Sequence, residues 1–384
     1  MTSIQIFHNI LWSKYKGAVF SQVYKQCLER ELDALFVQIA ETESDRVALG
    51  GVDTTYHQYP YRLLFKGAYF DTPLIQRIKA LATEAWNSDA DLVVLAGYER
   101  PEYWVMLAIL FIRRRRRAVF CDSTQFDRPR SRLKAIAKWT FFAMCHGFFA
   151  YGQRSKEYLQ SFGVPADRIF FRCQAAALPA DYEPIDVFAK RLGVLRAEGA
   201  RDRFVYVGRL SPEKDLPTLI AAFSTVVRHR PHASLHLCGA GPQLEDLRQL
   251  TKSLALTEQV HFHGSQSISQ LATHFLSATA LVLPSWSEPW GLVVNEALSY
   301  GCPVIVSHRC GCVPELVKDG ETGYVFRAGD AVDLADKMTL LASLDTRDAQ
   351  RLARLAMTLI EEHSPAKAAH QILLGAEQLI VQAG

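Results

Sequence analysis

The sequence predicts an α/β protein with two domains, each a doubly wound parallel sheet, and three observations carry this prediction. Short apolar runs bounded like buried parallel strands alternate with segments of helical spacing through both halves of the chain. The chain has 384 residues, more than a single core usually organises, and 49% of them are apolar. A shift to polar composition near residues 180–202 then marks the domain boundary. We expect a first domain over residues 1–190 and a second over 200–362.

Five strands and five helices are expected in the first half. The apolar runs IQIF, ALFVQIA, DLVVLAG, AVFC and GFFAY predict the strands, and helical spacing covers residues 18–32, 73–87, 101–112, 130–145 and 153–161. The loop HNILWSKYKGAVFSQ follows the first strand and lies at the carboxyl edge of the predicted sheet, with Gly17 opening the next helix.

The second half repeats this pattern. RFVYV, SLHLC, QVHFHG and ALVLP predict strands, and the intervening helices are expected at residues 216–230, 243–254 and 268–277. After ALVLP comes SEPWGLVVNEA, residues 287–297, which leads from a strand into a helix through an aromatic-Gly turn. Such a loop lies where open α/β sheets bind ligands.

Two carboxylates and a helix start make SEPWGLVVNEA a candidate binding site. Backbone N–H groups around Trp290, Gly291 and Leu292 are suited to an anion because they have no partner inside the helix. Glu288 lies before the helix and Glu296 within it. Ionised carboxylates only accept hydrogen bonds, so these two residues suit sugar hydroxyls better than phosphate and can meet different parts of one elongated ligand.

The positive charge for a phosphate comes from the loop after RFVYV, which contains Gly208, Arg209 and Lys214. A guanidinium and an ammonium five residues apart fit a diphosphate. Taken alone, each of these features is also compatible with solvated charges or chance spacing. Their order at the ends of successive strands favours a site.

The sequence resembles retaining glycosyltransferases of the GT-B fold, in glycosyltransferase group 1 (GT4). The resemblance is carried by the GRL-x3-K segment, CGAGP, HFHG, E-x7-E and GCPVIVS...GCVPELVKDGETGYVF, over about residues 203–330. It implies two facing Rossmann-like domains, with residues 363–384 forming a helix that crosses back to the first. It also implies a metal-independent transfer from a nucleoside-diphosphate sugar, UDP or GDP, without a cofactor.

The resemblance assigns roles to individual residues. Arg209 and Lys214 are expected to neutralise the diphosphate in the transition state, Glu288 to hold sugar hydroxyls and Glu296 the ribose hydroxyls. Backbone at His263 and Gly264 corresponds to the nucleobase contact, and Gly17 to a donor-phosphate contact. Lys16, however, replaces the first glycine of that pair. Asp122 stands near the place of a catalytic histidine, and two roles remain open for it, binding an acceptor hydroxyl or capping its loop.

One segment makes the protein basic. Between Arg113 and Lys138 there are ten Lys or Arg and two Asp, whereas the whole chain has a net charge of +3. Arg130, Lys134 and Lys138 recur every four residues opposite Leu133, Ile136, Ala137 and Thr140. This pattern indicates an anionic membrane surface as partner, hence a lipid-linked sugar acceptor and a peripheral location at the cytoplasmic face of the membrane. A solvated helix packed by its apolar face onto the sheet is the alternative. No nucleic-acid-binding motif accompanies the charges.

The remaining composition is that of an ordinary globular chain. Eight cysteines occur without metal-like spacing, so we expect reduced thiols and no metal site. The amino-terminal residues do not have the pattern of a signal peptide. Rival functions are a nucleotide-sugar epimerase, a phosphorylase and a non-catalytic membrane-surface scaffold. The sequence names neither the donor sugar, the base, the acceptor, the linkage nor the oligomeric state.

Overall fold

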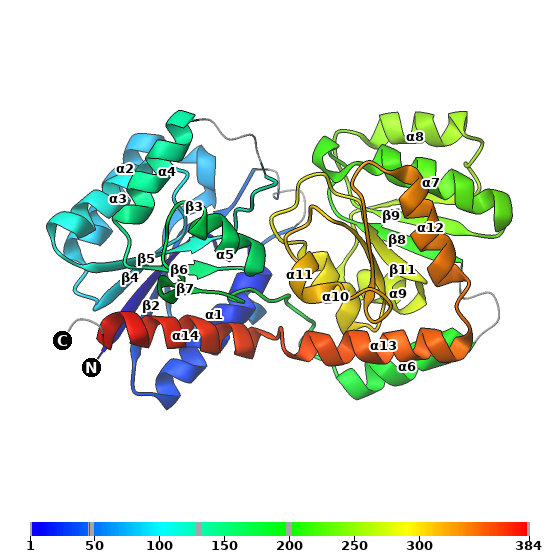
Figure 1. The fold of residues 1–384 in the computed structure, drawn as a ribbon. Coiled ribbons are helices and arrows are strands. Elements are labelled where there is room, and N and C mark those ends of the chain that lie inside the picture. The colour runs from blue at the N-terminus through cyan, green and yellow to red at the C-terminus, as the bar shows by residue number, and fades with distance from the viewer. Residues whose placement is uncertain (1, 45, 47–49, 128–131, 197–201, 382–384) are drawn as a thin grey trace. The chain divides into compact units, whose positions relative to one another are not determined.

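The computed structural model describes residues 2–44, 46, 50–127, 132–196 and 202–381 (Figure 1). The chain divides into two compact units. Unit 1 comprises residues 1–125, 129–177 and 364–384, and unit 2 comprises residues 126–128 and 178–363.

Unit 1 contains a seven-stranded sheet in the order β3-β2-β1-β4-β5-β6-β7, and every paired strand is parallel to its neighbour. Its strands are β1 (Ser3–Ile10), β2 (Asp33–Thr42), β3 (Tyr61–Ala68), β4 (Leu92–Leu95), β5 (Arg116–Cys121), β6 (Gly147–Ala150) and β7 (Ile169–Phe170). Its helices are α1 (Lys14–Glu29), α2 (Leu74–Asn87), α3 (Pro101–Ile112), α4 (Arg132–Ala143), α5 (Gln153–Gln160) and α14 (Pro365–Val381), with short 3-10 turns η2 (Thr54–Tyr56), η3 (Tyr69–Asp71) and η4 (Ala166–Arg168).

Alternate residues of these strands enter two separate cores, one on each face of the sheet. Leu92 and Val94 of β4 face the core covered by α1 and α14, whereas Val93 and Leu95 face the core covered by α2, α3, α4 and α5 (Figure 1). Both faces are therefore buried, as expected for a parallel sheet between helices.

The carboxyl-terminal helix α14 belongs to unit 1. Two glycines allow its close approach, because a Cβ on Gly375 would lie 2.4 Å from Phe170 Cγ and one on Gly147 would lie 2.3 Å from Leu379 Cδ1. Ile372 and Leu373 of the helix are fully buried in the α1 core. The last helix thus returns to the first domain.

Unit 2 contains a six-stranded parallel sheet in the order β10-β9-β8-β11-β12-β13. Its strands are β8 (Arg203–Val207), β9 (Ser234–Cys238), β10 (Val260–Gly264), β11 (Ala280–Leu283), β12 (Val304–Ser307) and β13 (Gly323–Phe326). Its helices are α6 (Pro184–Arg196), α7 (Leu216–His229), α8 (Leu244–Ser253), α9 (Ile268–Ser277), α10 (Leu292–Ser299), α11 (Val313–Leu316), α12 (Ala331–Ala342) and α13 (Thr346–Glu361), with the 3-10 turn η5 (Pro212–Lys214).

The expected α/β architecture of two doubly wound parallel sheets is confirmed. One expectation within it was wrong, because the polar link near residues 180–202 contains helix α6, which packs against α9 and α13. The buried guanidinium of Arg191 anchors this helix by donating to the carbonyls of Gly301 (3.1 Å) and Leu276 (2.6 Å). The division between the units therefore precedes α6, at residues 177–178.

Candidate functional site

The carboxyl ends of β8 and β11 hold the candidate residues of unit 2. These two strands are neighbours in the centre of the sheet, with β9 and β10 on one side and β12 and β13 on the other. The crossover direction therefore reverses between them, which is the position where open α/β sheets bind ligands. Gly208, Arg209 and Lys214 follow β8, and Glu288 follows β11.

The fold brings Lys214 and Glu288 together. The ammonium of Lys214 donates to Glu288 Oε2, and the side chains are only 13% and 15% exposed. A cation and an acid separated by 74 positions in the chain thus form one largely buried pair. A buried ion pair is costly to desolvate and contributes little to stability. We therefore regard the pair as a candidate for function.

Arg209 lies in the same loop but has a different partner. Its exposed guanidinium donates to Glu213 Oε1 at 3.1 Å, and Ser211 Oγ donates to the same oxygen at 2.6 Å. Partial burial opposes ionisation of Glu213, but the hydrogen bond from Ser211 and the nearby cations outweigh it and lower the pKa of this carboxyl. The sequence analysis did not single out Glu213, although an acid between two candidate cations is a readable signal.

Backbone hydrogen bonds hold the site loops against each other. The Glu213 carbonyl accepts from the amides of Trp286 (2.8 Å) and Ser287 (3.3 Å), which connects the loops after β8 and β11. The Glu288 carbonyl accepts from Gly311 in the loop after β12 at 2.9 Å. The acid of the pair is thus held in a loop fixed from both sides.

Helix α10 begins without a capping side chain. Gly291 is its N-cap residue, and φ of +100° places it in a conformation that favours glycine. Trp290 is buried and its indole N–H donates to Asn295 Oδ1 at 2.8 Å, so the turn is fixed by packing. The helix starts at Leu292 with no side chain on its first-turn N–H groups, which leaves them suited to an anion.

Glu296 is half-buried in α10, and its carboxyl has no hydrogen bond or ion pair within the ranges that the structure describes. Burial raises the pKa of this carboxyl to about 7. An acid held in this way can accept or donate a hydrogen bond near neutral pH, which suits the hydroxyls of a ligand.

The predicted nucleobase contacts His263 and Gly264 lie at the end of β10, where both have contacts within the protein. The imidazole of His263 contacts His236, with Nε2 and Nδ1 2.8 Å apart. The Gly264 carbonyl accepts from the amide of Gly239 at 2.8 Å, and the His263 carbonyl accepts from Gln266 Nε2 at 2.8 Å. Each carbonyl thus has one donor, and the backbone contact of His263 and Gly264 with a nucleobase stays a prediction.

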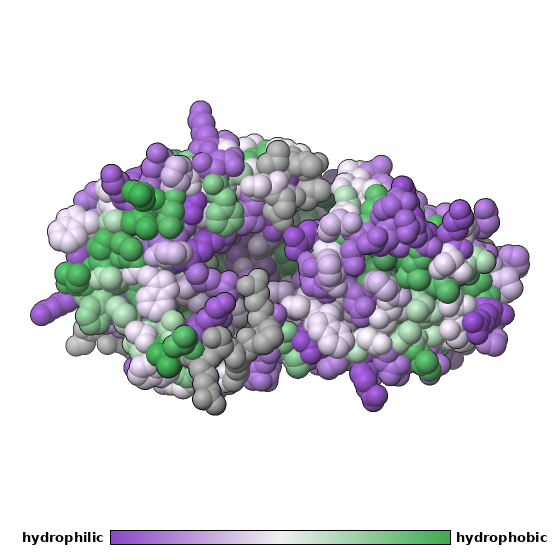
Figure 2. Space-filling model, turned by 90° about the horizontal axis from the view of Figure 1, so that it is seen from above, coloured by the Kyte–Doolittle hydropathy of each residue, from purple (hydrophilic) through white to green (hydrophobic). Residues whose placement is uncertain are grey.

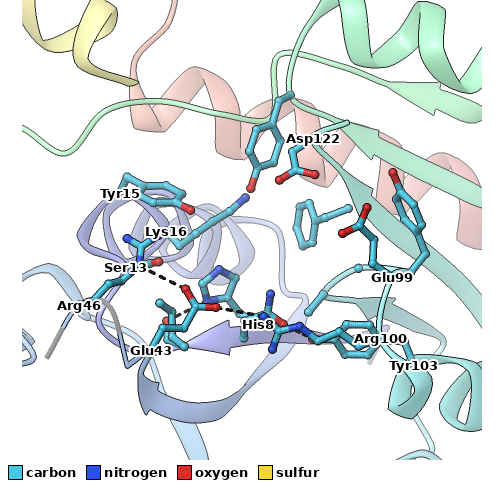
Figure 3. A pocket seen from close by; sticks show the side chains of 17 residues that line it. His8, Ser13, Tyr15, Lys16, Glu43, Arg46, Glu99, Arg100, Tyr103 and Asp122 are labelled. Carbon is cyan, nitrogen blue, oxygen red and sulfur yellow. Dashed lines mark hydrogen bonds and ion pairs between the residues drawn. The ribbon is translucent and has the colours of Figure 1, made fainter. Parts of the chain in front are cut away.

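Unit 1 has a pocket of about 270 Å³ at the corresponding position of its own sheet (Figure 3). The crossover direction reverses between β1 and β4, and the pocket is lined by residues that follow these strands and β2, β5 and β6. Its charged lining residues comprise three cations and three acids, namely Lys16, Arg46, Arg100, Glu43, Glu99 and Asp122.

Lys16 is the unusual member of this lining. The side chain is 1% exposed, and its ammonium has no hydrogen-bond partner among the described residues. It faces the rings of Phe120 and Tyr151, whose centroids lie 4.4 and 4.5 Å away, and Figure 3 shows it reaching into the pocket. Burial lowers the pKa of Lys16 to about 8. A buried ammonium that faces a pocket and has no hydrogen-bond partner among the described residues is a candidate for binding an anion.

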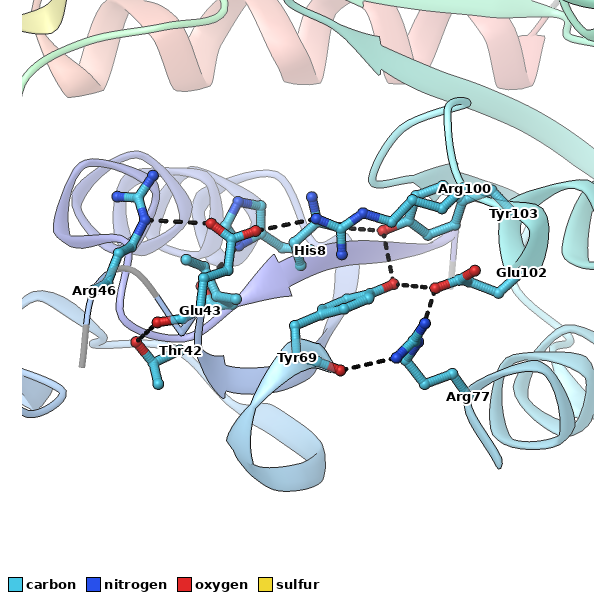
Figure 4. Close-up of polar contacts among 11 residues, drawn as sticks. His8, Thr42, Glu43, Arg46, Tyr69, Arg77, Arg100, Glu102 and Tyr103 are labelled. Atoms are coloured by element: carbon cyan, nitrogen blue, oxygen red, sulfur yellow. Dashed lines mark hydrogen bonds and ion pairs between the residues drawn. The ribbon is translucent and has the colours of Figure 1, made fainter. Parts of the chain in front are cut away.

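The other cations of the pocket are engaged (Figure 4). Glu43 accepts from Arg46 (3.3 Å) and Arg100 (3.0 Å), and the Arg100 guanidinium lies 3.8 Å from the centroid of the Tyr69 ring. Behind them, Tyr69 and the buried Arg77 both donate to Glu102 Oε1, at 2.7 and 3.0 Å. These contacts fix the pocket wall.

Two further residues that the sequence analysis singled out, Asp122 and Gly17, lie in unit 1, and their surroundings differ from each other. Asp122 is exposed and lines the pocket, and its carbonyl accepts from Ser155 Oγ at 3.2 Å. Gly17 does not open its helix as expected, because α1 already begins at Lys14. Its amide donates to the Ser13 carbonyl, and a Cβ there would lie 2.8 Å from His57. Gly17 therefore has no free N–H for a phosphate and instead allows close packing.

Comparison with known proteins shows what this chain is similar to. Residues 193–356 match the family model "Glycosyl transferases group 1". The sulfoquinovosyl transferase of Arabidopsis thaliana is 33% identical over 162 residues, which are 41% of this chain and 30% of the plant protein. The D-inositol 3-phosphate glycosyltransferase of Nocardia farcinica is 29% identical over 215 residues, 54% of this chain and 46% of that relative. The chain thus spans less than half the length of both.

Structural similarity extends over nearly the whole chain. HepE from Anabaena, in complex with UDP and glucose, superposes with a TM-score of 0.73, covering 98% of this chain and 100% of HepE at 19% identity. The expected GT-B fold is therefore confirmed, and unit 2 contains the glycosyl transferases group 1 match.

Proposed function

We propose that the protein is a retaining, metal-independent glycosyltransferase of the GT4 type, which transfers a sugar from a nucleoside-diphosphate sugar to an anionic, membrane-associated acceptor in surface polysaccharide synthesis. The group 1 match of unit 2 and the UDP complex of HepE support a nucleotide-sugar donor. The observation that carries the proposal is the buried Lys214 and Glu288 pair at the strand ends where the sheet reverses direction.

The candidate residues of unit 2 can each bind a different part of the donor. The diphosphate is placed near Lys214, Arg209 and the uncapped start of α10, where positive charge stabilises the charge that develops on the leaving group. Glu288 then accepts hydrogen bonds from sugar hydroxyls in place of the Lys214 ammonium. The carboxyl of Glu296, which has no partner among the described residues, binds the ribose hydroxyls. The departing phosphate deprotonates the acceptor on the same face of the sugar, so the anomeric configuration is retained.

Incubation with labelled donors tests this assignment. Replacement of Lys214 by Ala should lower turnover by about 10² or more, because it removes the buried charge opposite the diphosphate. Lys252→Ala, which removes an exposed lysine of α8, serves as the control. Unchanged turnover in Lys214→Ala would disprove the site. NMR of the product reports whether the anomeric configuration is retained.

The donor base and the rival functions are separated by simple measurements. A thermal-shift screen of UDP, GDP, ADP and CDP sugars identifies the base, because a ligand bound only by the native state raises the melting temperature. An epimerase would convert the donor without any acceptor, and a phosphorylase would require phosphate. A scaffold would show neither donor binding nor slow donor hydrolysis.

The pocket of unit 1 is the proposed acceptor site. Lys16 supplies a buried ammonium for a phosphate or carboxylate of the acceptor, and the exposed carboxylate of Asp122 can bind its hydroxyl. The name of the Nocardia farcinica relative, D-inositol 3-phosphate glycosyltransferase, likewise refers to a phosphorylated, anionic compound. Acceptors with and without the anionic group should therefore differ in KM for the wild-type protein. Equal KM values would contradict the role of Lys16.

An exposed apolar surface on unit 1 supports membrane association and goes against the alternative in which the apolar face of α4 packs onto the sheet. Leu133, Ile136 and Trp139 are 80%, 63% and 57% exposed, so the face of α4 that carries them does not pack on the sheet, whereas Phe141 and Phe142 at the end of the helix do. Phe111 and Ile112 at the end of α3 are exposed as well. Figure 2 shows apolar patches among charged groups on unit 1. Contiguous exposed apolar groups mark interaction surfaces.

The arginine run contributes less free charge than its sequence indicates. Arg113 and Arg115 pair with Asp89, Arg116 donates to the Leu379 carbonyl, and Arg117 is buried and donates to the Arg115 carbonyl at 2.8 Å. Arg114 and Lys134 are exposed and have no counter-ion in the described ranges. We therefore assign membrane binding mainly to the apolar face of α4, with these two cations facing anionic lipids. Across the described ranges, every helix is too short or too polar to cross a bilayer.

Liposome flotation tests this surface. The variant Leu133→Gln/Ile136→Gln should lose most binding to vesicles that contain phosphatidylserine, because about 25 cal/mol per Å² of inserted apolar area is lost. Ile185→Gln is the matched control, since Ile185 is equally exposed on α6 of unit 2. Flotation of the double variant at the wild-type level would refute the membrane proposal.

A further inference from the structure

Three histidines that are distant in the sequence meet on one face of the unit 2 sheet. His236 lies on β9, His263 on the edge strand β10, and His274 on α9, which Figure 1 shows beside this sheet. One ring nitrogen of each lies within 4.8 Å of the others. His236 and His274 are buried, and His263 is the most accessible of the three.

The contacts inside the cluster bring ring nitrogens of the three histidines close to one another. His236 Nδ1 and His263 Nε2 are 2.8 Å apart, and the ring centroids of His263 and His274 are 4.7 Å apart. His236 and His274 are buried, and burial favours the neutral form of an imidazole. Neutral imidazole is the form that binds metal ions.

We propose that His236, His263 and His274 form a binding site for a divalent transition-metal ion, with Zn²⁺ the preferred occupant and a water or a small anion as fourth ligand. Three imidazoles with an open position are a known ligand set for Zn²⁺. Bonds of about 2.0–2.1 Å in tetrahedral geometry place ligand nitrogens about 3.3 Å apart. Small side-chain rotations bring the present spacing, 2.8 Å to at most 4.8 Å, to that value.

Two polar groups lie beside the histidine cluster, and one favours metal binding while the other opposes it. Ser234 Oγ lies 3.1 Å from His236 Nε2 and can accept its N–H when Nδ1 binds the metal, which fixes the tautomer. Arg203 Nη2 lies 3.1 Å from His274 Nδ1 and donates to it. Its guanidinium must release His274 when the metal binds, and its charge opposes the cation. Removing that charge should therefore tighten binding.

A bound metal ion would hold the edge strand β10 against its neighbours. Strand β10 is paired on one side only, by β9, and the three ligands connect it to β9 and to α9. The three ligands do not include Lys214 or Glu288, the pair that carries the proposed transfer site.

Titration of the chelator-treated protein with Zn²⁺, in competition with a chromophoric chelator, tests the proposal. The wild type should bind one Zn²⁺ per chain, His263→Gln and His274→Gln should each bind at least tenfold more weakly, and Arg203→Gln more tightly. His232→Gln is the control, because His232 is exposed in the turn before β9 and outside the cluster. Circular dichroism verifies that each variant is folded.

Co²⁺ spectra distinguish imidazole from thiolate ligation, since all eight cysteines are buried thiols. The expected result is a tetrahedral Co²⁺ spectrum without a thiolate charge-transfer band, lost in His263→Gln. A wild type that binds less than one equivalent, a thiolate band, or equal affinity in wild type and both cluster variants would each overturn the proposal.

Discussion

Replacement of Lys16 by Met should stabilise unit 1 while impairing its use of an anionic acceptor. Met keeps most of the length and volume of the Lys stem and removes the ammonium, which has no hydrogen-bond partner among the described residues. The two effects have opposite signs because the charge is held in the pocket for binding, at a cost to folding.

The magnitude follows from the lowered pKa. Burial lowers the pKa of Lys16 from 10.5 to about 8, and one pH unit corresponds to about 1.4 kcal/mol, so holding the charged form costs about 3 kcal/mol. Contacts with the Phe120 and Tyr151 rings offset about 1–2 kcal/mol of this cost. The net gain on replacement is about 1–2 kcal/mol, or roughly 2–6 °C in melting temperature.

The pKa values of Lys16 in the folded and the unfolded state also fix the sign of the pH dependence of stability. Below pH 8 the lysine is charged in both the folded and the unfolded state, so the full cost is present. Between pH 8 and 10.5 the folded state loses its proton first, and the cost disappears. The stability difference between Lys16→Met and wild type should therefore be constant below pH 8 and shrink above it.

Thermal denaturation across pH 6–10 measures the difference, with Lys25→Met, an exposed position on the same helix, as control. Transfer to acceptors with and without a phosphate or carboxylate measures the functional effect. A variant that melts at or below the wild-type temperature at neutral pH would refute the reasoning on burial. A more stable variant with unchanged acceptor KM would refute only the role in binding.

Three further predictions concern other parts of the two units. Because burial raises the pKa of Glu296 to about 7, donor binding should change through neutral pH in the wild type and lose this dependence in Glu296→Gln, as isothermal calorimetry at several pH values would show. Arg77→Met leaves the buried carboxylate of Glu102 without its cation and should cost about 3–5 kcal/mol in denaturant unfolding, far more than an exposed arginine. Gly311→Ala places a Cβ 1.7 Å from the Pro289 carbonyl and should displace the loop that holds Glu288, so donor affinity should fall at least tenfold in the same calorimetric assay.

The sequence alone predicted much of the succession of strands and helices. In unit 2 the expected strand cores and the helix at residues 268–277 agree with the structure, because buried parallel strands are continuous apolar runs and amphipathic helices repeat every 3.6 residues. Strand β3 was missed because it lies at the sheet edge and its residues are mostly exposed or half-buried. Its sequence therefore lacks a continuous apolar run.

Only the tertiary structure decided which charged groups meet. Local spacing identified Lys214 and Glu288 as candidates, but their contact depends on β8 and β11 being neighbours in the sheet. In the same way, the histidine cluster depends on β9, β10 and α9, and the outward apolar face of α4 on how that helix is rotated against the sheet. Periodicity is a property of neighbouring residues in the chain. Pairing between distant residues is set by strand order and helix packing, which the local pattern does not contain.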